Sequence, residues 1–138
     1  MKSSSSIKNI ALAAVKRSSV KSENWQFTTL EPTALPNEVS NTADELPLVL
    51  YFETDENWTL ITTTRILGKV ESTYQEVLFL ELDDVIFGNY KRSASGKTIF
   101  RVIDFHGANK NFIMEAGSAS MAYIYSIGII EKMYKTSA

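Results

Sequence analysis

The stretch LVLYFETDENWTLITTTRIL (residues 48–67) decides the fold class of this 138-residue chain. Its two halves, 48–53 and 58–67, are rich in β-branched and aromatic residues, which favour strands. The four polar residues TDEN (54–57) between them have the composition of a tight turn. The stretch is therefore predicted to form a β-hairpin, with Gly68 closing its second strand.

The chain beyond this hairpin continues with short extended runs separated by turn signals. The clearest turn signals are SASG (93–96) and HGANK (106–110). The further predicted strands are 77–82, 84–91, 98–105 and 111–115. Strands this short and this closely spaced are typical of small antiparallel sandwiches and barrels.

The segment 119–135 predicts an unusually apolar C-terminal helix. Its principal face is expected to comprise Met121, Ile124, Tyr125, Gly128, Ile129 and Met133, widened by Tyr123, Ile127, Ile130 and Tyr134. A helix this apolar must be covered over most of its circumference. The sheet is expected to cover one side of it, and a second chain is one candidate for the other side.

The first 45 residues differ from the remainder. Positions on one helical face are apolar near the N-terminus: Ile7, Ile10, Ala11, Ala14 and Val15. The serine run 3–6 offers N-caps for this helix. Residues 19–44 contain two prolines and several turn formers, and we expect an irregular or partly helical connector there. The predicted organisation is thus a helix and connector (1–45) followed by a β-rich α+β domain (46–138).

Charge is distributed in blocks along the chain. Residues 1–22 carry five basic and no acidic residues, whereas 23–58 carry eight acidic and no basic ones. The two blocks are expected to neutralise each other in the folded chain, with an acidic partner for the first block as the alternative. The net charge of −2 gives no indication of nucleic-acid binding.

Composition excludes several kinds of site. The chain has no cysteine, which excludes disulfides, thiolate metal sites and cysteine nucleophiles. Its single histidine, His106, excludes a site that needs two imidazoles, and no cofactor or metal is expected. The apolar run 10–15 is too short for a signal peptide, so the cytoplasm is the expected location.

Three segments carry recognisable strand motifs: NWTLITTTRIL (57–67), ELDDVIFGNYK (81–91) and FRVIDFHGANKNFIMEAG (100–117). The first segment contains Thr64-Arg65-Ile66, and the second contains Leu82 followed by Asp84, Val85 and Ile86. The third segment is a pair of predicted strands joined by a turn that contains glycine. Together they resemble bacterial pleckstrin-homology-like (PH-like) and GRAM-like domains, over roughly residues 46–135.

This resemblance implies a PH-like barrel or sandwich of six or seven antiparallel strands, closed by the C-terminal helix. It also implies a scaffold that binds rather than catalyses, with phosphoinositides, peptides or proteins as ligands. Family members that bind phosphoinositides use basic residues on the first two strands and their loop. The matching loop here, 53–57, has three acids and no base, so it would repel a phosphorylated headgroup.

Three groups of side chains are candidate binding residues. Lys91, Arg92 and Lys97 flank a glycine-containing loop and form a candidate anion site, with a solvated hairpin tip as the alternative. The aromatic residues Trp25, Phe27, Tyr123 and Tyr134 form a candidate interaction surface. For Trp25 and Phe27 the alternative is that they pin the connector to the sheet. Arg65 is expected to pair with an acid across the sheet.

The alternative of a small enzyme depends on two other groups. Asp83 and Asp84, with Glu81 nearby, have the residue types to bind a metal ion or to act as a general acid and a general base. Because adjacent residues of a strand point to opposite faces, these side chains meet only if a β-bulge lies between them. His106 beside Asp104 has the residue types of a general base, although the local sequence is better explained as a turn.

The predicted function is accordingly a non-enzymatic module that engages a protein partner. The alternative outside this class is a peripheral module for anionic lipid that uses the basic N-terminal helix. Residues 7–17 and 121–134 are expected to bury one another, within one chain or across the two-fold axis of a weak homodimer.

Overall fold

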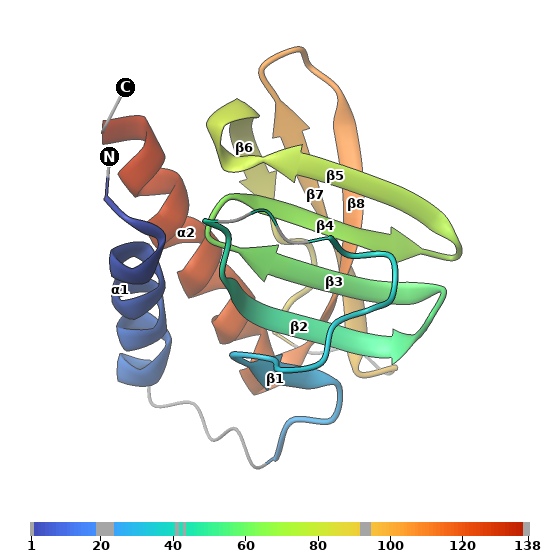
Figure 1. Cartoon of the computed structure of the whole chain (residues 1–138). Coiled ribbons are helices and arrows are strands. Elements are labelled where there is room, and N and C mark those ends of the chain that lie inside the picture. The colour runs from blue at the N-terminus through green and yellow to red at the C-terminus, as the bar shows by residue number, and fades with distance from the viewer. Residues whose placement is uncertain (1, 19–23, 41, 43, 92–94, 137–138) are drawn as a thin grey trace.

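The computed structural model describes residues 2–18, 24–40, 42, 44–91 and 95–136. Figure 1 shows two β-sheets with two helices beside them, and both ends of the chain lie on the helical side. The helices are α1 (Ser4–Arg17) and α2 (Ser120–Thr136), and two single 3₁₀ turns, η2 (Phe79–Glu81) and η3 (Gly117–Ala119), complete the helical elements among the described residues.

The larger sheet has five antiparallel strands in the order β1-β2-β3-β4-β5. They are β1 (Thr28–Leu30), β2 (Pro47–Thr54), β3 (Asn57–Thr62), β4 (Arg65–Val70) and β5 (Thr73–Leu78). The smaller sheet comprises β6 (Leu82–Ile86), β7 (Lys97–Asp104) and β8 (Asn109–Glu115), also antiparallel and in sequence order. The predicted α+β class with a C-terminal helix is confirmed. Seven of the described strands, β2–β8, lie within the predicted domain 46–138, and β1 is an additional strand from the N-terminal extension. The strands form two separate sheets, and no closed barrel is present among the described residues.

The main core lies between the two sheets and α2. Its largest fully buried side chains include Tyr51 of β2, Phe100 of β7, Phe112 of β8 and Tyr123 of α2. The rings of Phe100 and Phe112 stack with their centroids 5.6 Å apart. Large aromatic side chains thus supply much of the apolar area that stabilises the fold.

A second, smaller core covers the opposite face of the larger sheet. It comprises Leu50, Trp58, Leu60 and Leu67, against which Leu35 and Val39 of the connector pack. Consecutive residues of β2 and β3 are therefore buried, because the main core lies on one face and the connector on the other. The connector is largely irregular, as predicted, but its first part forms β1 at the edge of the sheet.

The second strand of the predicted hairpin, 58–67, is in fact two strands, β3 and β4. The turn after β2 is confirmed, but the threonine run does not continue the second strand. The hydroxyl of Thr62 accepts hydrogen bonds from the backbone N–H groups of Thr64 (3.1 Å) and Arg65 (3.0 Å), which closes a second tight turn. Thr62 therefore acts as a turn residue here, a role that side-chain-to-backbone hydrogen bonds give to threonine.

Gly68 does not close a strand but lies in the middle of β4, opposite Thr59. A Cβ atom at this position would lie 2.3 Å from the carbonyl oxygen of Trp58. Only glycine allows two backbones to approach so closely. The predicted strand 84–91 is also too long, because β6 ends at Ile86 and Gly88 has a φ of +31°.

The N-terminal helix is confirmed. Ser3 caps α1 by accepting a hydrogen bond from the Ser6 backbone N–H at 3.2 Å. Ile7, Ala11 and Val15 are buried, and α1 packs directly against α2 within the same chain. The predicted contact between the two helices is therefore observed within one chain.

The face of α2 that enters the core is not the principal face predicted. Tyr123, Ile127 and Ile130 are fully buried, whereas Tyr125 is 43% exposed and Gly128 is exposed. The pattern was ambiguous because apolar residues surround most of this helix. None of the described helices combines the length and the apolar character that a membrane span requires.

Candidate functional site

The connector is held on the sheet by a buried carboxylate. Glu45 accepts hydrogen bonds from the hydroxyls of Thr62 (2.7 Å) and Thr64 (2.9 Å) and from Nε of Arg65 (2.7 Å). Burial alone would raise the pKa of Glu45, but these hydrogen bonds, led by that from Arg65, outweigh burial and lower it. The predicted pairing of Arg65 with an acid is confirmed, and Arg65 also binds Glu76 of β5 at 2.9 Å.

A second carboxylate fixes the start of the connector. Glu115, at the end of β8, accepts hydrogen bonds from the backbone N–H groups of Gln26 and Phe27, each at 2.8 Å. The hydroxyl of Thr28 donates to the same carboxylate at 2.7 Å. The connector is thus anchored near both of its ends, which fixes the position of its middle part over the sheet.

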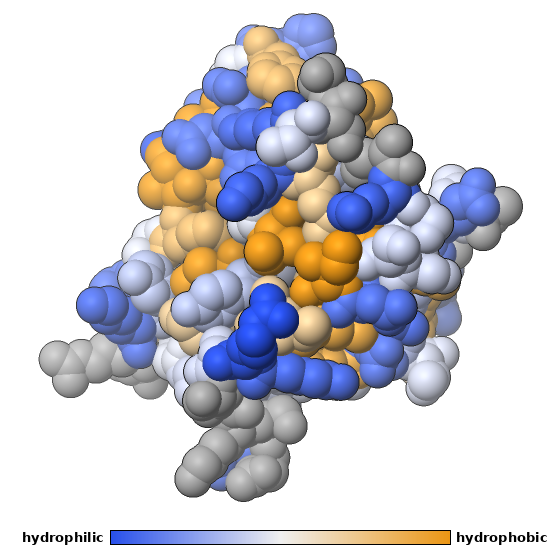
Figure 2. All heavy atoms as spheres, turned by 90° about the vertical axis from the view of Figure 1, so that its left-hand side faces the viewer, coloured by the Kyte–Doolittle hydropathy of each residue, from blue (hydrophilic) through white to orange (hydrophobic). Residues whose placement is uncertain are grey.

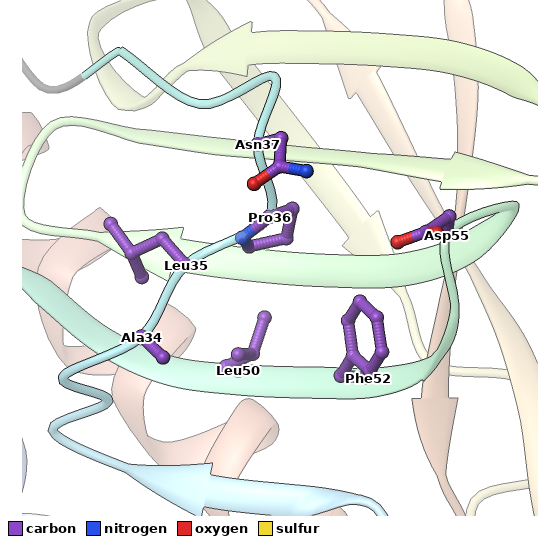
Figure 3. A pocket seen from close by; sticks show the side chains of 7 residues that line it. All are labelled: Ala34, Leu35, Pro36, Asn37, Leu50, Phe52 and Asp55. Carbon is purple, nitrogen blue, oxygen red and sulfur yellow. The ribbon is translucent and has the colours of Figure 1, made fainter.

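The middle of the connector forms one wall of a groove on the outer face of the larger sheet. We call this the connector groove, and its lining residues are Ala34, Leu35, Pro36, Asn37, Leu50, Phe52 and Asp55. Figure 3 shows Leu50 and Phe52 rising from β2 toward the connector, with Asp55 at the turn after that strand. The groove has a volume of about 390 Å³, within the usual size range of ligand sites.

The groove combines an apolar floor with a single carboxylate, Asp55, at its rim. Phe52 is 40% exposed, although the four residues that precede it on β2 are buried. Glu38, the connector residue that follows Asn37, is already paired with Lys69. Asp55 forms no ion pair with any described residue, but it lies near enough to Lys69 to contribute, after Glu38, to the raised pKa of that lysine.

One residue of the candidate anion site, Lys97, is engaged by a carboxylate of the chain itself. Lys97 donates to both carboxylate oxygens of Glu53, at 2.8 and 2.9 Å, and this contact lowers the pKa of Glu53. An anion would have to compete with that carboxylate for Lys97. Lys91 is exposed in the loop after β6, and Arg92 lies outside the described residues.

The candidate aromatic surface is largely engaged inside the chain. Tyr123 is fully buried with its hydroxyl 2.7 Å from that of Thr28, so the prediction that it contacts a partner is wrong. Tyr134 is partly buried, stacks on Phe79 and donates a hydrogen bond to the Thr63 carbonyl at 3.0 Å. Both tyrosines lie on the side of α2 that faces the sheets, which the periodicity of an almost wholly apolar helix did not distinguish.

Trp25 and Phe27 pin the connector, the alternative that the sequence left open. Phe27 packs against Tyr51 with ring centroids 5.4 Å apart, and both Trp25 and Phe27 are partly buried against the main core. Their backbone and side chains therefore hold the entry to β1 in place.

The residues of the enzyme alternative do not form a cluster. A register shift between Leu82 and Asp84 supplies the bulge, but Asp83 and Asp84 are both exposed. Within the described ranges no three acidic or histidine side chains are placed to hold a metal ion. His106 is exposed, and Asp104 accepts hydrogen bonds from the backbone N–H groups of His106 (2.9 Å) and Ala108 (3.0 Å), as in a simple turn.

The connector groove was not predicted from the sequence. One signal for it was present in β2, where Leu48, Val49, Leu50 and Tyr51 are apolar in succession instead of alternating. Such a run indicates burial on both faces, so some other segment had to cover the outer one. The sequence does not show which connector residues do so, because that depends on the Glu45 and Glu115 contacts across the fold.

Comparison of the chain with protein-family models, with curated proteins and with solved structures finds no match.

Proposed function

We propose that this chain is a non-enzymatic, PH-like binding module that engages a protein partner through the connector groove. The observation that carries this proposal is the apolar groove itself, with the 40% exposed ring of Phe52 at its floor. The order of elements supports the PH-like assignment: successive antiparallel strands in two packed sheets, followed by one helix that covers the core.

The chemistry of the groove favours an extended protein segment as its ligand. Aromatic side chains in apolar depressions are the usual anchors of protein interfaces. The unpaired carboxylate of Asp55 lies beside the floor, so the segment is expected to carry an apolar side chain and a nearby lysine or arginine. The groove lies on a face held rigid by the Glu45 and Glu115 contacts, which reduces the entropy lost on binding.

Selection of peptides from a random library on the immobilised full chain tests this proposal. Selected peptides should share an apolar residue close to a basic one. Calorimetric titration should give a Kd at least about tenfold higher for Phe52→Ser than for the unmodified chain, because the floor loses its aromatic anchor. Asp55→Asn should weaken binding less and reduce its dependence on salt.

Phe105→Ser is the matched control for this experiment. Phe105 is 63% exposed at the end of β7 and does not line the groove. Its removal should leave the Kd unchanged. The proposal is contradicted if no peptide is enriched, or if Phe52→Ser and Phe105→Ser have equal effects.

A further inference from the structure

The two helices form one outer layer of the molecule, and this layer is basic. We define the helix layer as α1 and α2 together with Lys2, which precedes the N-cap of α1. Its charged residues are Lys2, Lys8, Lys16, Arg17, Lys132 and Lys135, against the single acid Glu131. Because the whole chain has a net charge of −2, the rest of the protein is acidic. The protein therefore presents one positive and one negative side.

Most of these positive charges are open to a partner. Lys8 pairs with Glu31 at 3.2 Å, and Lys135 pairs with Glu131 at 2.8 Å. The other four cations form no ion pair with any residue that the structure describes, and Lys16 and Arg17 are exposed at the end of α1. Among the described residues, the neutralisation expected between the basic and acidic blocks is observed for one pair, Lys8 with Glu31.

The helix layer also exposes apolar side chains. Ile10 of α1 is 37% exposed and Tyr125 of α2 is 43% exposed. Figure 2 looks onto this side of the molecule and shows apolar side chains gathered near its centre, with hydrophilic ones around them. A cleft of about 300 Å³ lies between the helices, lined by Ala14, Arg17, Ser18, Tyr125 and Ile129.

From this arrangement we propose that the helix layer docks on the surface of an anionic lipid bilayer. Apolar and tyrosine side chains surrounded by lysine and arginine are the pattern by which helices lie in a membrane interface. The cleft places one guanidinium beside apolar walls, which suits a lipid phosphate attached to its hydrocarbon chain. An acidic protein surface would satisfy the cations but would leave the apolar centre without a matching partner.

The mode of docking differs from insertion of the N-terminal helix alone. The most apolar side of α1, with Ile7, Ala11 and Val15, is buried inside the protein. The helix therefore remains packed on α2, and the pair contacts the membrane as one surface. This site lies on a different face from the connector groove, so the module would hold its protein partner while attached to a membrane.

Co-sedimentation of the full chain with lipid vesicles tests the proposal. The chain should bind vesicles of phosphatidylcholine with phosphatidylglycerol, should not bind phosphatidylcholine alone, and should be released by high salt. Lys16→Gln combined with Arg17→Gln should weaken binding by about tenfold or more, since each basic residue near the surface contributes severalfold. Tyr125→Ser should weaken binding with all charges retained.

The matched control is Lys69→Gln combined with Arg101→Gln, which removes the same charge from the two sheets. It should bind anionic vesicles as well as the unmodified chain, and thermal melting should show that every variant is folded. Equal losses in the two double variants would overturn the proposal, as would equal binding to neutral and anionic vesicles. Failure to bind vesicles, together with binding to polyglutamate, would overturn it in favour of an acidic protein surface.

Discussion

At the scale of single residues, alanine substitution is expected to have opposite effects on stability at Gly68 and at Gly128. Gly68 is required by the close approach of β4 to β3, where an added Cβ would lie 2.3 Å from the Trp58 carbonyl oxygen. Gly68→Ala should lower the free energy of unfolding by about 2 kcal/mol or more, because the backbone must shift. Gly128→Ala is the control: no atom lies within 4 Å of the added Cβ, so this substitution in α2 should stabilise the fold by about 0.5–1 kcal/mol. Urea denaturation measures both, and a stable Gly68→Ala variant would contradict the strand pairing described.

The Glu45–Arg65 pair gives a second prediction at this scale. The Glu45 side chain is fully buried and that of Arg65 is 13% exposed. Arg65→Ala should destabilise the fold by about 3 kcal/mol, because it leaves a buried carboxylate without its cation. Lys135→Ala removes an exposed pair and should cost less than about 1 kcal/mol in the same assay. Equal effects of the two substitutions would show that Glu45 is not buried in solution.

The same carboxylate predicts how stability depends on pH. The pKa values of Glu45 and Asp104 are lowered in the folded chain, by hydrogen bonds from Arg65 and from backbone N–H groups respectively, so the unfolded chain binds protons first as pH falls. Stability should be constant near neutral pH and should decline below about pH 4.5, as these groups are protonated. Glu45→Gln should be less stable than the unmodified chain at pH 7 and should lose less on acidification. Thermal melting across this range measures the effect, and a stability that rises on acidification would contradict it.

At the scale of elements, strands that adjoin tight turns could be predicted from the sequence. The ends of strands could not be predicted where contacts with residues distant in the sequence determine them. The predictions of β7, β8 and α1 hold because local composition and periodicity determine them. The threonine run was misread because a β-branched residue also suits a turn when its hydroxyl binds the next backbone N–H groups, as that of Thr62 does. The core face of α2 was misread because apolar residues surround the helix, so only the packing of α1 and the sheets selects the buried side.

The corrected face of α2 leads to a direct prediction. Ile127 is fully buried, whereas Tyr125 is 43% exposed. Ile127→Ala should lower the free energy of unfolding by about 2–4 kcal/mol through the cavity it creates. Tyr125→Ala should change it by less than about 1 kcal/mol, in line with other exposed positions. If Tyr125→Ala were the more destabilising substitution, the buried face of α2 would be the one predicted from periodicity.

At the scale of the whole molecule, the structure separates two surfaces. The connector covers the outer face of the larger sheet and forms an apolar groove with one carboxylate, while the two helices form a basic layer on another side (Figure 1). The charge blocks of the sequence did not predict this division, because they were expected to neutralise each other. The fold places the described acidic connector on a sheet and packs α1 of the basic block on α2. The weak homodimer stays a prediction. The contact between the two helices occurs within one chain, so it does not require a second copy.

The central claim is that the connector groove binds a protein segment, and NMR mapping of the binding site tests it most directly. A peptide selected on the full chain is titrated into the ¹⁵N-labelled protein, and the shift of each backbone amide is followed. We expect the largest changes at residues 34–37 and 50–55, and we expect Phe52→Ser to remove them. Changes centred on the helix layer, or unaltered by Phe52→Ser, would contradict it.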